Sequence, residues 1–449
     1  MNGATGAEKA DKTEKSEKSE KAEKKRLKFL FVSIDALIGD LAWQVKKEGH
    51  EVRYNILNKE QRDVCDGFVD KCDSWTDNTA WADVIVFDDF GFGKEADEQR
   101  KAGKPVVGGS SYSDKLEMDR EFGQKELEAA GISIIPRWNF TSFDAAAEFI
   151  MKNPDRYVLK PSGMAQNEKE LLFVGQEEDG KDIVEMLHRY KKVWSKQIKE
   201  FQLQKYISGV EVAVGAFFNG KEFLSSINVN FEHKRMFPGE LGPSTGEMGT
   251  SMFFTTNSPL FDATLAKMKD RLAASGYVGY IDINCIVNSR GIYPLEFTSR
   301  FGYPHISIMM EGVLSEWGTF LYGIAKGEKP EFRTKRAFEV GVVVAVPPFP
   351  FHDPASFRKY SEDASIIFKK PVFEGIHLGD VKLDDADWKL AGNSGYALVV
   401  TGSGTTMEDA RNMAYNRVKN IIIPNLFYRT DIGKRWGEDR DRLSIWGYM

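Results

Sequence analysis

The stretch YIDINCIVNSRGIYPLEFT, residues 280–298, predicts a β-hairpin. Its two strand-like runs, Tyr280–Val287 and Ile292–Thr298, are joined by Asn288–Gly291, four residues that favour a turn. The first run is strongly apolar except for two polar positions, and the second carries an acid and a hydroxyl near its end. The hairpin therefore predicts both a part of the fold and a candidate site.

The polar residues of this hairpin fall on alternate positions. Asp282 and Asn284 share one face of the first strand, and Glu296 and Thr298 share one face of the second. If these faces point the same way, two carboxylates and two neutral oxygen donors converge, and an all-oxygen set suits Mg²⁺. The spacing also leaves open a solvated hairpin face with ordinary polar residues.

The chain outside the hairpin divides into regions of different pattern. Residues 27–113 alternate apolar runs with helical spacing, which predicts an N-terminal βαβ domain. Residues 114–330 begin with a helix and continue in strands, and residues 331–449 predict a small α+β domain. The segments behind these predictions are the strands Phe29–Ile34, Val52–Ile56, Val84–Phe87, Pro105–Gly109, Tyr157–Lys160, Phe201–Tyr206, Val340–Val346 and Tyr396–Thr401, and the helices Leu37–Gly49, Lys115–Gly131 and Met407–Ile421. The predicted fold class is α/β.

Acidic residues follow the predicted parallel strands of the N-terminal domain. Asp35 follows the first strand, and Asp88 and Asp89 follow the third. Parallel sheets bind ligands at the carboxyl ends of their strands, so these residues are candidate substrate contacts. Ordinary caps and turns are the alternative interpretation.

Composition excludes several classes of function. The net charge of −6 and the absence of a basic stripe outside the tail argue against nucleic acid as a partner. The three cysteines cannot form a disulfide framework, and no run is apolar and long enough to cross a membrane. Residues 1–26, a Lys/Glu-rich repeat, predict a disordered charged tail. The sequence thus predicts a cytoplasmic protein with small-molecule substrates, and it leaves the oligomeric state open.

Motifs in order along the chain resemble one enzyme family. Pro294–Pro304 (PLEFTSRFGYP) resembles the "EFNxRFGDPE" segment of phosphoribosylamine–glycine ligases, ATP-grasp enzymes of purine biosynthesis. Glu232–Arg235 (EHKR) with Gly242–Gly249 (GPSTGEMG) resembles "DHKR…GPNTGGMG". Leu426–Gly433 (LFYRTDIG) resembles "CFYRKDIG", and Tyr396–Thr401 before it resembles the strand "VLCVTA". The resemblance implies an N-terminal pre-ATP-grasp domain, a two-lobed ATP-grasp core and a small C-terminal cap.

The resemblance also implies a reaction and a set of site residues. Enzymes of this family phosphorylate a carboxylate with ATP and Mg²⁺ (Mn²⁺ is possible), and an amine then displaces phosphate from the acyl phosphate. Carried over motif by motif, the implied residues are Lys234 and Arg300 as catalytic cations; Lys160, Gln204, Lys205, Tyr206, Ile207, Glu211 and Leu295 for ATP; Glu296, Asp282 and Thr298 for the metal; and Thr245, Gly246 and Gly249 for the substrates. Asp35 and Asp88 match no family motif and stay candidate substrate contacts because they follow the predicted parallel strands.

Several positions depart from the family pattern. The glycine-rich flap "GLAAGKGV" is replaced at Gly163–Glu170, with Lys169 as a partial substitute, and Gln124 stands where the family has a phosphate-contacting lysine. The N-terminal glycine-rich loop is lost and acids are gained, which favours a cationic or hydroxyl-rich amine over a phosphorylated one. We therefore predict an ATP-dependent C–N ligase that acts on glycine or a similar small amino acid. A catalytically impaired nucleotide-binding homologue is the alternative.

Overall fold

The computed structural model describes residues 25–162 and 171–449. The substituted flap at 163–170, including Lys169, and residues 1–24 of the predicted tail lie outside the described residues. Among the helices that the structure describes, none has the length and apolar character needed to cross a membrane.

The N-terminal region forms a parallel βαβ sheet, as the apolar runs predict. Its strands follow the order β2-β1-β3-β4. Alternate side chains of the first strand enter different cores, because Phe29 and Phe31 pack in one and Leu30 and Val32 in another. Both faces of the sheet are therefore covered, which explains the continuous apolar runs. The elements are β1 (Lys28–Ser33), α1 (Gly39–Lys47), β2 (Glu51–Ile56), β3 (Val84–Phe87), α2 (Gly93–Lys101) and β4 (Val106–Val107).

The single helix predicted over Lys115–Gly131 is wrong, because the structure has two helices there. They are α3 (Ser111–Met118) and α4 (Arg120–Ala129). Asp119 between them has extended backbone, with φ −112° and ψ 94°, and its side chain accepts a hydrogen bond of 3.0 Å from the Phe122 N–H. An aspartate that caps a new helix favours this break, and the helical spacing of the apolar residues does not reveal it.

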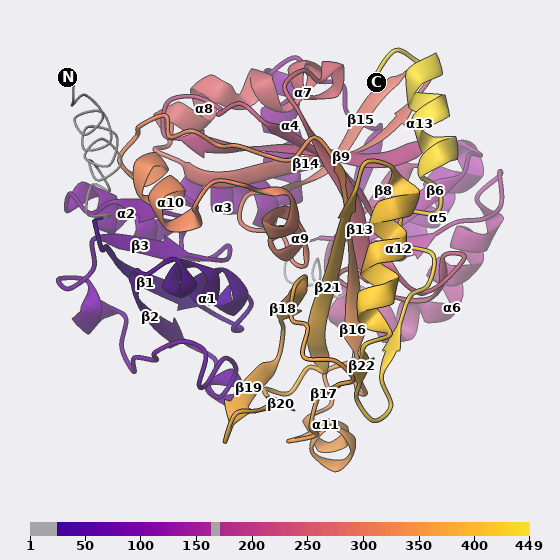
Figure 1. Ribbon diagram of the computed structural model, residues 1–449. Helices are drawn as coiled ribbons and strands as arrows, with labels where there is room; N and C mark the ends of the chain where they lie inside the picture. The colour runs from indigo at the N-terminus through magenta and orange to yellow at the C-terminus, as the bar shows by residue number, and fades with distance from the viewer. Residues whose placement is uncertain (1–24, 163–170) are drawn as a thin grey trace, which may run out of the picture.

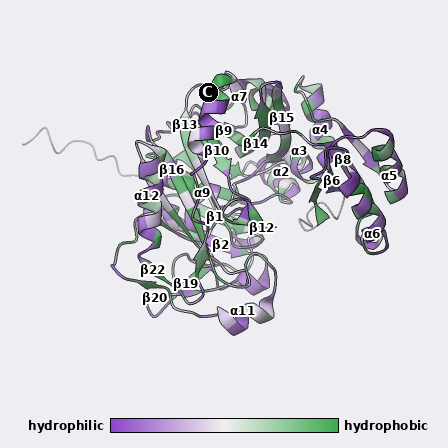
Figure 2. Ribbon diagram, turned by 90° about the vertical axis from the view of Figure 1, so that its right-hand side faces the viewer, coloured by the Kyte–Doolittle hydropathy of each residue, from purple (hydrophilic) through white to green (hydrophobic). Residues whose placement is uncertain are grey.

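A small lobe follows, with an antiparallel sheet in the order β5-β8-β6-β7. Its own core is formed by side chains of the sheet and of two helices that pack against each other. Figure 2 shows this lobe projecting from the rest of the molecule. The elements are β5 (Arg137–Phe140), α5 (Phe143–Lys152), β6 (Tyr157–Pro161), β7 (Phe173–Val174), α6 (Lys181–Gln197) and β8 (Phe201–Lys205).

A large antiparallel sheet forms the centre of the molecule (Figure 1), in the order β15-β14-β9-β10-β13-β16-β21-β18. The predicted hairpin is its β14–β15 edge. Its strands are β9 (Val210–Asn219), β10 (Ile227–Glu232), β13 (Gly249–Thr255), β14 (Val278–Asn288), β15 (Gly291–Thr298), β16 (Phe338–Ala345), β18 (Ile376–Leu378) and β21 (Tyr396–Gly404), with β23 (Phe427–Tyr428) paired to β16. A two-stranded hairpin of β11 (Arg235–Phe237) and β12 (Leu241–Ser244) extends between β10 and β13.

The large sheet continues across residue 330, the predicted start of the C-terminal domain. β13 pairs with β16, with Gly249 opposite Val342, and β16 pairs with β21. The C-terminal region therefore shares a sheet with the core, and the predicted domain boundary stays a prediction. The remaining elements are α7 (Pro259–Ala263), α8 (Lys269–Ala274), α9 (His305–Gly312), α10 (Trp317–Ala325), α11 (Pro354–Tyr360), β17 (Ile367–Phe368), β19 (Val381–Asp384), β20 (Asp387–Leu390), α12 (Met407–Val418), β22 (Ile421–Ile422) and α13 (Trp436–Ile445).

Candidate active site

The polar face of the β14–β15 hairpin lines a cavity of about 590 Å³. The strand register places Asp282 opposite Thr298 and Asn284 opposite Glu296. The two faces predicted from residue alternation are therefore one face of the sheet, and all four side chains line the cavity. Asp282 and Asn284 are buried, so an ordinary solvated face does not describe these two positions.

Several other elements enclose the same cavity. The α3–α4 pair forms one wall, the residues from the end of β10 to the start of β13 form a second, and the segment between β15 and α9 forms a third. Their principal polar side chains are Glu117, Arg120, Gln124, Glu232, Lys234, Thr245, Glu247, Arg300, Tyr303 and His305. The helix break at residue 119 matters here, because both helices contribute side chains to the wall.

Lys234 places its ammonium group among three carboxylates. Its Nζ atom lies 3.0 Å from Glu211, 3.2 Å from Glu232 and 3.2 Å from Glu296. The charge of Lys234 lowers the pKa of Glu296 to about 2. Burial lowers the pKa of Lys234, but the three acids outweigh it and raise that pKa well above its ordinary value. Lys234 and Glu296 are both charged at neutral pH, and such a cluster can exchange partners when phosphate or metal enters.

The neighbouring Asp282 has the features of a cation ligand. Its side chain is only 2% exposed, and its Oδ1 atom has no hydrogen-bond partner among the described residues. Burial, with the charge of Glu232, raises the pKa of Asp282 well above its usual range. Asn284 donates to Glu211 at 3.2 Å and to Glu232 at 3.0 Å, while its own Oδ1 has no partner in the described chain. A divalent cation bound to these oxygens would offset the burial of charge.

The donor set that fits such a cation is mixed. Within residues 25–162 and 171–449, no three His, Cys, Asp or Glu side chains are arranged to hold a metal ion by themselves. The candidates are instead the carboxylates of Asp282 and Glu296 together with the neutral oxygens of Asn284 and Thr298. Mg²⁺ commonly binds through one or two protein carboxylates and completes its coordination with water and phosphate oxygens.

Arg300 joins the hairpin to the N-terminal domain. Its Nε atom lies 3.2 Å from Asp89 and 3.2 Å from Glu117, and its guanidinium lies 5.8 Å from the centre of the Phe90 ring and 5.9 Å from that of Tyr303. Burial lowers the pKa of Arg300, but the two acids outweigh it and raise the pKa above its ordinary value. Two carboxylates thus share its charge before any substrate binds.

Three residues predicted to bind ATP lie in or beside the cavity. Leu295 lines the cavity directly, and Glu211 forms an ion pair with Lys234, which lines the cavity. Lys160 lies on β6, where burial and the charge of Arg120 lower its pKa to about 8. A bound phosphate would favour the charged form of this lysine, which is the property expected of a phosphate contact.

The remaining predicted ATP residues, Gln204–Ile207, lie at the end of β8 and just beyond it, outside the cavity lining. Lys205 forms an ion pair with Asp155 at 2.5 Å. Gln204 is 2% exposed, and its Nε2 atom has no partner in the part of the chain that the structure describes. The adenine-binding role of this segment stays a prediction.

The predicted substrate residues of the core separate in the structure. Thr245 and Gly246 line the cavity, and both the N–H and the hydroxyl of Thr245 donate to the Lys234 carbonyl at 2.8 Å. Gly249 instead lies inside the sheet, in β13, where an added Cβ would lie 2.4 Å from the Gly341 carbonyl oxygen. The structure therefore does not bring Gly249 to the cavity, because main-chain pairing takes that position.

The predicted acids of the N-terminal domain also separate. Asp35 accepts a hydrogen bond of 2.9 Å from Asn58, and buried Asp88 accepts one from Ser33. Neither lines the cavity. Burial and the charge of Asp89 raise the pKa of Asp88 well above its usual range. Of these acids, Asp89 lies nearest to the site, through its ion pair with Arg300.

Sequence reasoning did not assign four charged residues of the cavity. Glu232 and Glu247 lie inside the EHKR and GPSTGEMG motifs, so those motifs contained the signal. Glu117 and Arg120 flank the helix break, which no residue pattern revealed. Their places depend on the orientation of α3 relative to α4.

Residues 118–306 match the family model described as "Phosphoribosylglycinamide synthetase, ATP-grasp (A) domain". This range contains the small lobe, the Lys234 cluster and the hairpin. The match identifies residues 118–306 as an ATP-grasp domain. The likeness of the chain to phosphoribosylamine–glycine ligases extends beyond the ATP-grasp domain, as the relatives below show.

The ATP-grasp chain is similar to curated phosphoribosylamine–glycine ligases over most of its length. It is 24% identical to that of Listeria innocua over 351 residues, which are 76% of this chain and 80% of the relative. It is 26% identical to that of Caulobacter vibrioides over 356 residues, which are 76% of this chain and 80% of the relative. The predicted family and ATP-dependent ligase class are confirmed by these relatives and by the family model.

Solved structures agree on the fold. The crystal structure of phosphoribosylamine–glycine ligase from Thermotoga maritima matches with a TM-score of 0.68 and 21% identity, covering 90% of this chain and 100% of that one. The biotin carboxylase domain of 2-oxoglutarate carboxylase from Hydrogenobacter thermophilus, in complex with MgADP and bicarbonate, matches with a TM-score of 0.64 and 12% identity, covering 95% and 100%. The predicted α/β ATP-grasp fold is confirmed.

Proposed function

We propose that this ATP-grasp protein is a carboxylate–amine ligase that joins glycine, or a similar small amino acid, to an amine. The observation that carries the proposal is the convergence of Lys234, Glu296 and Asp282 in one cavity beside Arg300. Phosphoryl transfer to a carboxylate requires cations at the phosphoryl group, and carboxylate oxygens such as those of Asp282 and Glu296 fit the Mg²⁺ that accompanies ATP. The relatives named phosphoribosylamine–glycine ligase support this assignment.

The reaction has two steps. An oxygen of the substrate carboxylate attacks the γ-phosphorus of ATP, which forms an acyl phosphate and releases ADP. The amine nitrogen then attacks the acyl carbon, the bond to the phosphate oxygen breaks, phosphate leaves, and the nitrogen loses a proton. The first step is needed because a carboxylate is a poor electrophile at neutral pH.

The side chains of the cavity have distinct roles in this proposal. Lys234 and Arg300 balance the negative charge of the phosphoryl group, and the Thr245–Gly246 main chain holds the amino acid. Asp282 and Glu296, with the Thr298 hydroxyl, would hold Mg²⁺, which would supply further charge neutralisation. Mn²⁺ would suit the same oxygen ligands.

The amine acceptor in this proposal carries no phosphate. The cavity meets the N-terminal domain at Arg300, whose charge is already shared by Asp89 and Glu117, with Asp88 buried behind them. A phosphate there would approach more acid than base. A cationic or hydroxyl-rich amine fits these surroundings better than phosphoribosylamine does.

The test is ADP release from Mg-ATP with the amino acid alone, the amine alone and both together. Hydroxylamine serves as a general acceptor, because it converts an acyl phosphate into a hydroxamate and phosphate. We expect hydroxamate with glycine or a similar amino acid, and we expect hydroxyl-bearing or cationic amines to accelerate ADP release more than phosphoribosylamine generated in the assay.

The outcomes separate the parts of the proposal. Absence of hydroxamate with every small amino acid, while ATP still raises the melting temperature, would contradict the ligase assignment and favour an impaired nucleotide-binding homologue. Hydroxamate formation with phosphoribosylamine as the best acceptor would keep the ligase and overturn only the acceptor class.

A further inference from the structure

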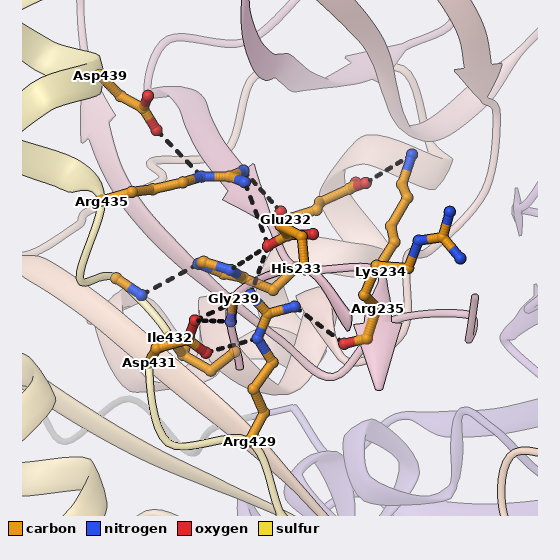
Figure 3. Close-up of polar contacts among 12 residues, drawn as sticks. Glu232, His233, Lys234, Arg235, Gly239, Arg429, Asp431, Ile432, Arg435 and Asp439 are labelled. Atoms are coloured by element: carbon orange, nitrogen blue, oxygen red, sulfur yellow. Dashed lines mark hydrogen bonds and ion pairs between the residues drawn. The ribbon is translucent and has the colours of Figure 1, made fainter. Parts of the chain in front are cut away.

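The last motif of the chain lies against the motif that carries Lys234. Figure 3 shows Arg429, Asp431 and Arg435 from the C-terminal segment reaching the turn and hairpin that follow β10. Almost two hundred residues separate the two motifs in the sequence, as in the hydrogen bond from Arg429 to the carbonyl of Arg235. The segment 429–435 is called the C-terminal clamp below.

Arg429 makes the central contacts of this clamp. It is 1% exposed, and its Nη1 atom donates to the Arg235 carbonyl at 2.9 Å. Its Nε and Nη2 atoms donate to Asp431 at 2.6 Å and 3.1 Å, and Nη2 also donates to Glu240. A planar guanidinium can satisfy a carbonyl and two carboxylates together, whereas an ammonium has no such fork.

The other clamp residues hold the same hairpin at further points. Asp431 accepts a hydrogen bond of 3.0 Å from the Gly239 N–H in the hairpin turn. The Gly433 N–H donates to Nε2 of His233 at 3.2 Å, and Arg435 donates to the Glu232 carbonyl at 2.8 Å. The clamp therefore contacts the chain immediately before Lys234, immediately after it and at the hairpin tip.

His233 connects the clamp directly to Lys234. It is 1% exposed, and because its Nε2 accepts from Gly433, the ring proton lies on Nδ1, which faces Glu240 at 3.6 Å. Burial lowers the pKa of His233, so the ring is neutral at neutral pH. Lys234 is thus held on both sides. It follows His233, which the clamp fixes, and the Lys234 carbonyl accepts hydrogen bonds from Thr245 at the end of the hairpin.

We propose that Arg429 is a positioning residue: through the β11–β12 hairpin it sets the place of the Lys234 ammonium and of the Thr245–Gly246 main chain at the reaction site. This inference rests on the proposed ligase function for its catalytic consequence. The C-terminal segment then acts on chemistry in the cavity although none of its residues lines that cavity. Residues that hold a reacting group in place act on the transition state more than on nucleotide binding.

The test compares Arg429→Lys with Arg411→Met in the full chain. Arg411 supports the clamp from its other side, since its Nε donates to the Ile432 carbonyl at 2.7 Å, and among the described residues it forms no hydrogen bond or ion pair with the hairpin. The Lys variant keeps a positive charge beside Asp431 but loses the planar guanidinium that donates to several partners at once. Both variants weaken the clamp, so a general loss of stability affects both.

We expect Arg429→Lys to lower kcat for hydroxamate formation by about tenfold or more, with the Kd for Mg-ATP within about twofold of wild type. We expect Arg411→Met to keep kcat within about twofold of wild type, even if its melting temperature falls as much as that of Arg429→Lys. A kcat of Arg429→Lys within twofold of wild type would overturn the inference. Equal losses of kcat in both variants at equal melting temperature would overturn it too.

Hydrogen exchange gives a second readout that needs no activity. Arg429→Lys should speed exchange of the amides from Arg235 to Thr245, and Arg411→Met should leave them near wild type. Unchanged exchange there in Arg429→Lys would overturn the positioning role. Faster exchange together with a wild-type protein that forms no hydroxamate would instead contradict the ligase function and leave the clamp's hold on the hairpin standing.

Discussion

The Nζ atom of Lys234 lies 3.2 Å from a carboxylate oxygen of Glu296, although 62 residues separate them in the sequence. The ammonium is held by acids from three strands, β9, β10 and β15. The lysine thereby balances acids that would otherwise repel one another in a partly enclosed cavity. The same geometry places a cation next to the oxygens that fit Mg²⁺, so a side chain of this chain neutralises part of the charge of these carboxylates.

Replacing Lys234 by Met should remove this balance. We expect hydroxamate formation to fall by about a hundredfold or more, because a cation at the phosphoryl group is lost.

We also expect Lys234→Met to lower the free energy of unfolding by about 1–2 kcal/mol. This loss is smaller than that for a fully buried ion pair, because the Lys234 side chain is 30% exposed. Thermal unfolding with and without excess Mg²⁺ measures the second effect. Mg²⁺ should stabilise the variant more than wild type, and a smaller Mg²⁺ effect would contradict the shared cation site; Lys326→Met, at an exposed pair, is the control.

Glu296→Gln should separate metal binding from folding. The amide keeps the shape of the side chain but removes a charge that faces Lys234 and fits Mg²⁺. We expect ADP release to fall by about a hundredfold or more, with a melting temperature close to wild type. Steady-state ADP assays across a range of Mg²⁺ concentrations are the measurement. Retained turnover would remove Glu296 from the site, and Glu98→Gln on the surface of α2 is the matched control.

Lys160→Met should weaken nucleotide binding. Burial lowers the pKa of this lysine to about 8, so a phosphate partner would stabilise its charged form. We expect the Kd for Mg-ATP to rise about tenfold, corresponding to about 1.4 kcal/mol. Calorimetric titration with a non-hydrolysed ATP analogue measures it. An unchanged Kd would place the phosphates elsewhere, and exposed Lys152→Met provides the comparison.

Glu339→Gln should change how stability depends on pH. Glu339 is fully buried in β16, and burial, with the charge of Glu311, raises its pKa to about 8. Between the unfolded value of 4.5 and about 8 the unfolded chain ionises while the native carboxyl stays protonated, so this residue makes the native state less stable as pH rises.

The variant therefore should lose that dependence. At about 1.4 kcal/mol for each unit of pKa, the wild-type loss from this residue across the window amounts to a few kcal/mol. Urea unfolding should show Glu339→Gln more stable relative to wild type at pH 9 than at pH 5. A constant difference at the two pH values would contradict the raised pKa.

Asp119→Ala tests the helix break that shapes one wall of the cavity. The side chain caps α4 through the Phe122 N–H, so its loss should cost about 1 kcal/mol. Chemical denaturation measures this cost. Equal stability of variant and wild type would mean that the two helices are oriented by packing alone; Asp144→Ala, a first-turn acid of α5 that is not its cap, is the control.

The β14–β15 hairpin shows what the local sequence pattern could predict. Alternation put Asp282 with Asn284 and Glu296 with Thr298, and the register confirms both pairs on one face. Pattern did not predict the helix break at Asp119, because apolar spacing continues through it while one side chain–backbone hydrogen bond caps the start of a new helix there. Nor could it exclude Gly249, whose place inside the sheet depends on pairing with β16, almost a hundred residues later.

The amino-acid sequence determined the strands, most helices, the family and the residue types of the site, since these depend on local periodicity and on short motifs. The tertiary structure alone decided which charges meet. Lys234 among three acids, Arg300 between Asp89 and Glu117, and Arg429 against the β11–β12 hairpin all join segments distant in the chain. Such contacts depend on how sheets and loops pack in three dimensions, and the energy of a charge depends on its neighbours and its burial, which no local pattern contains.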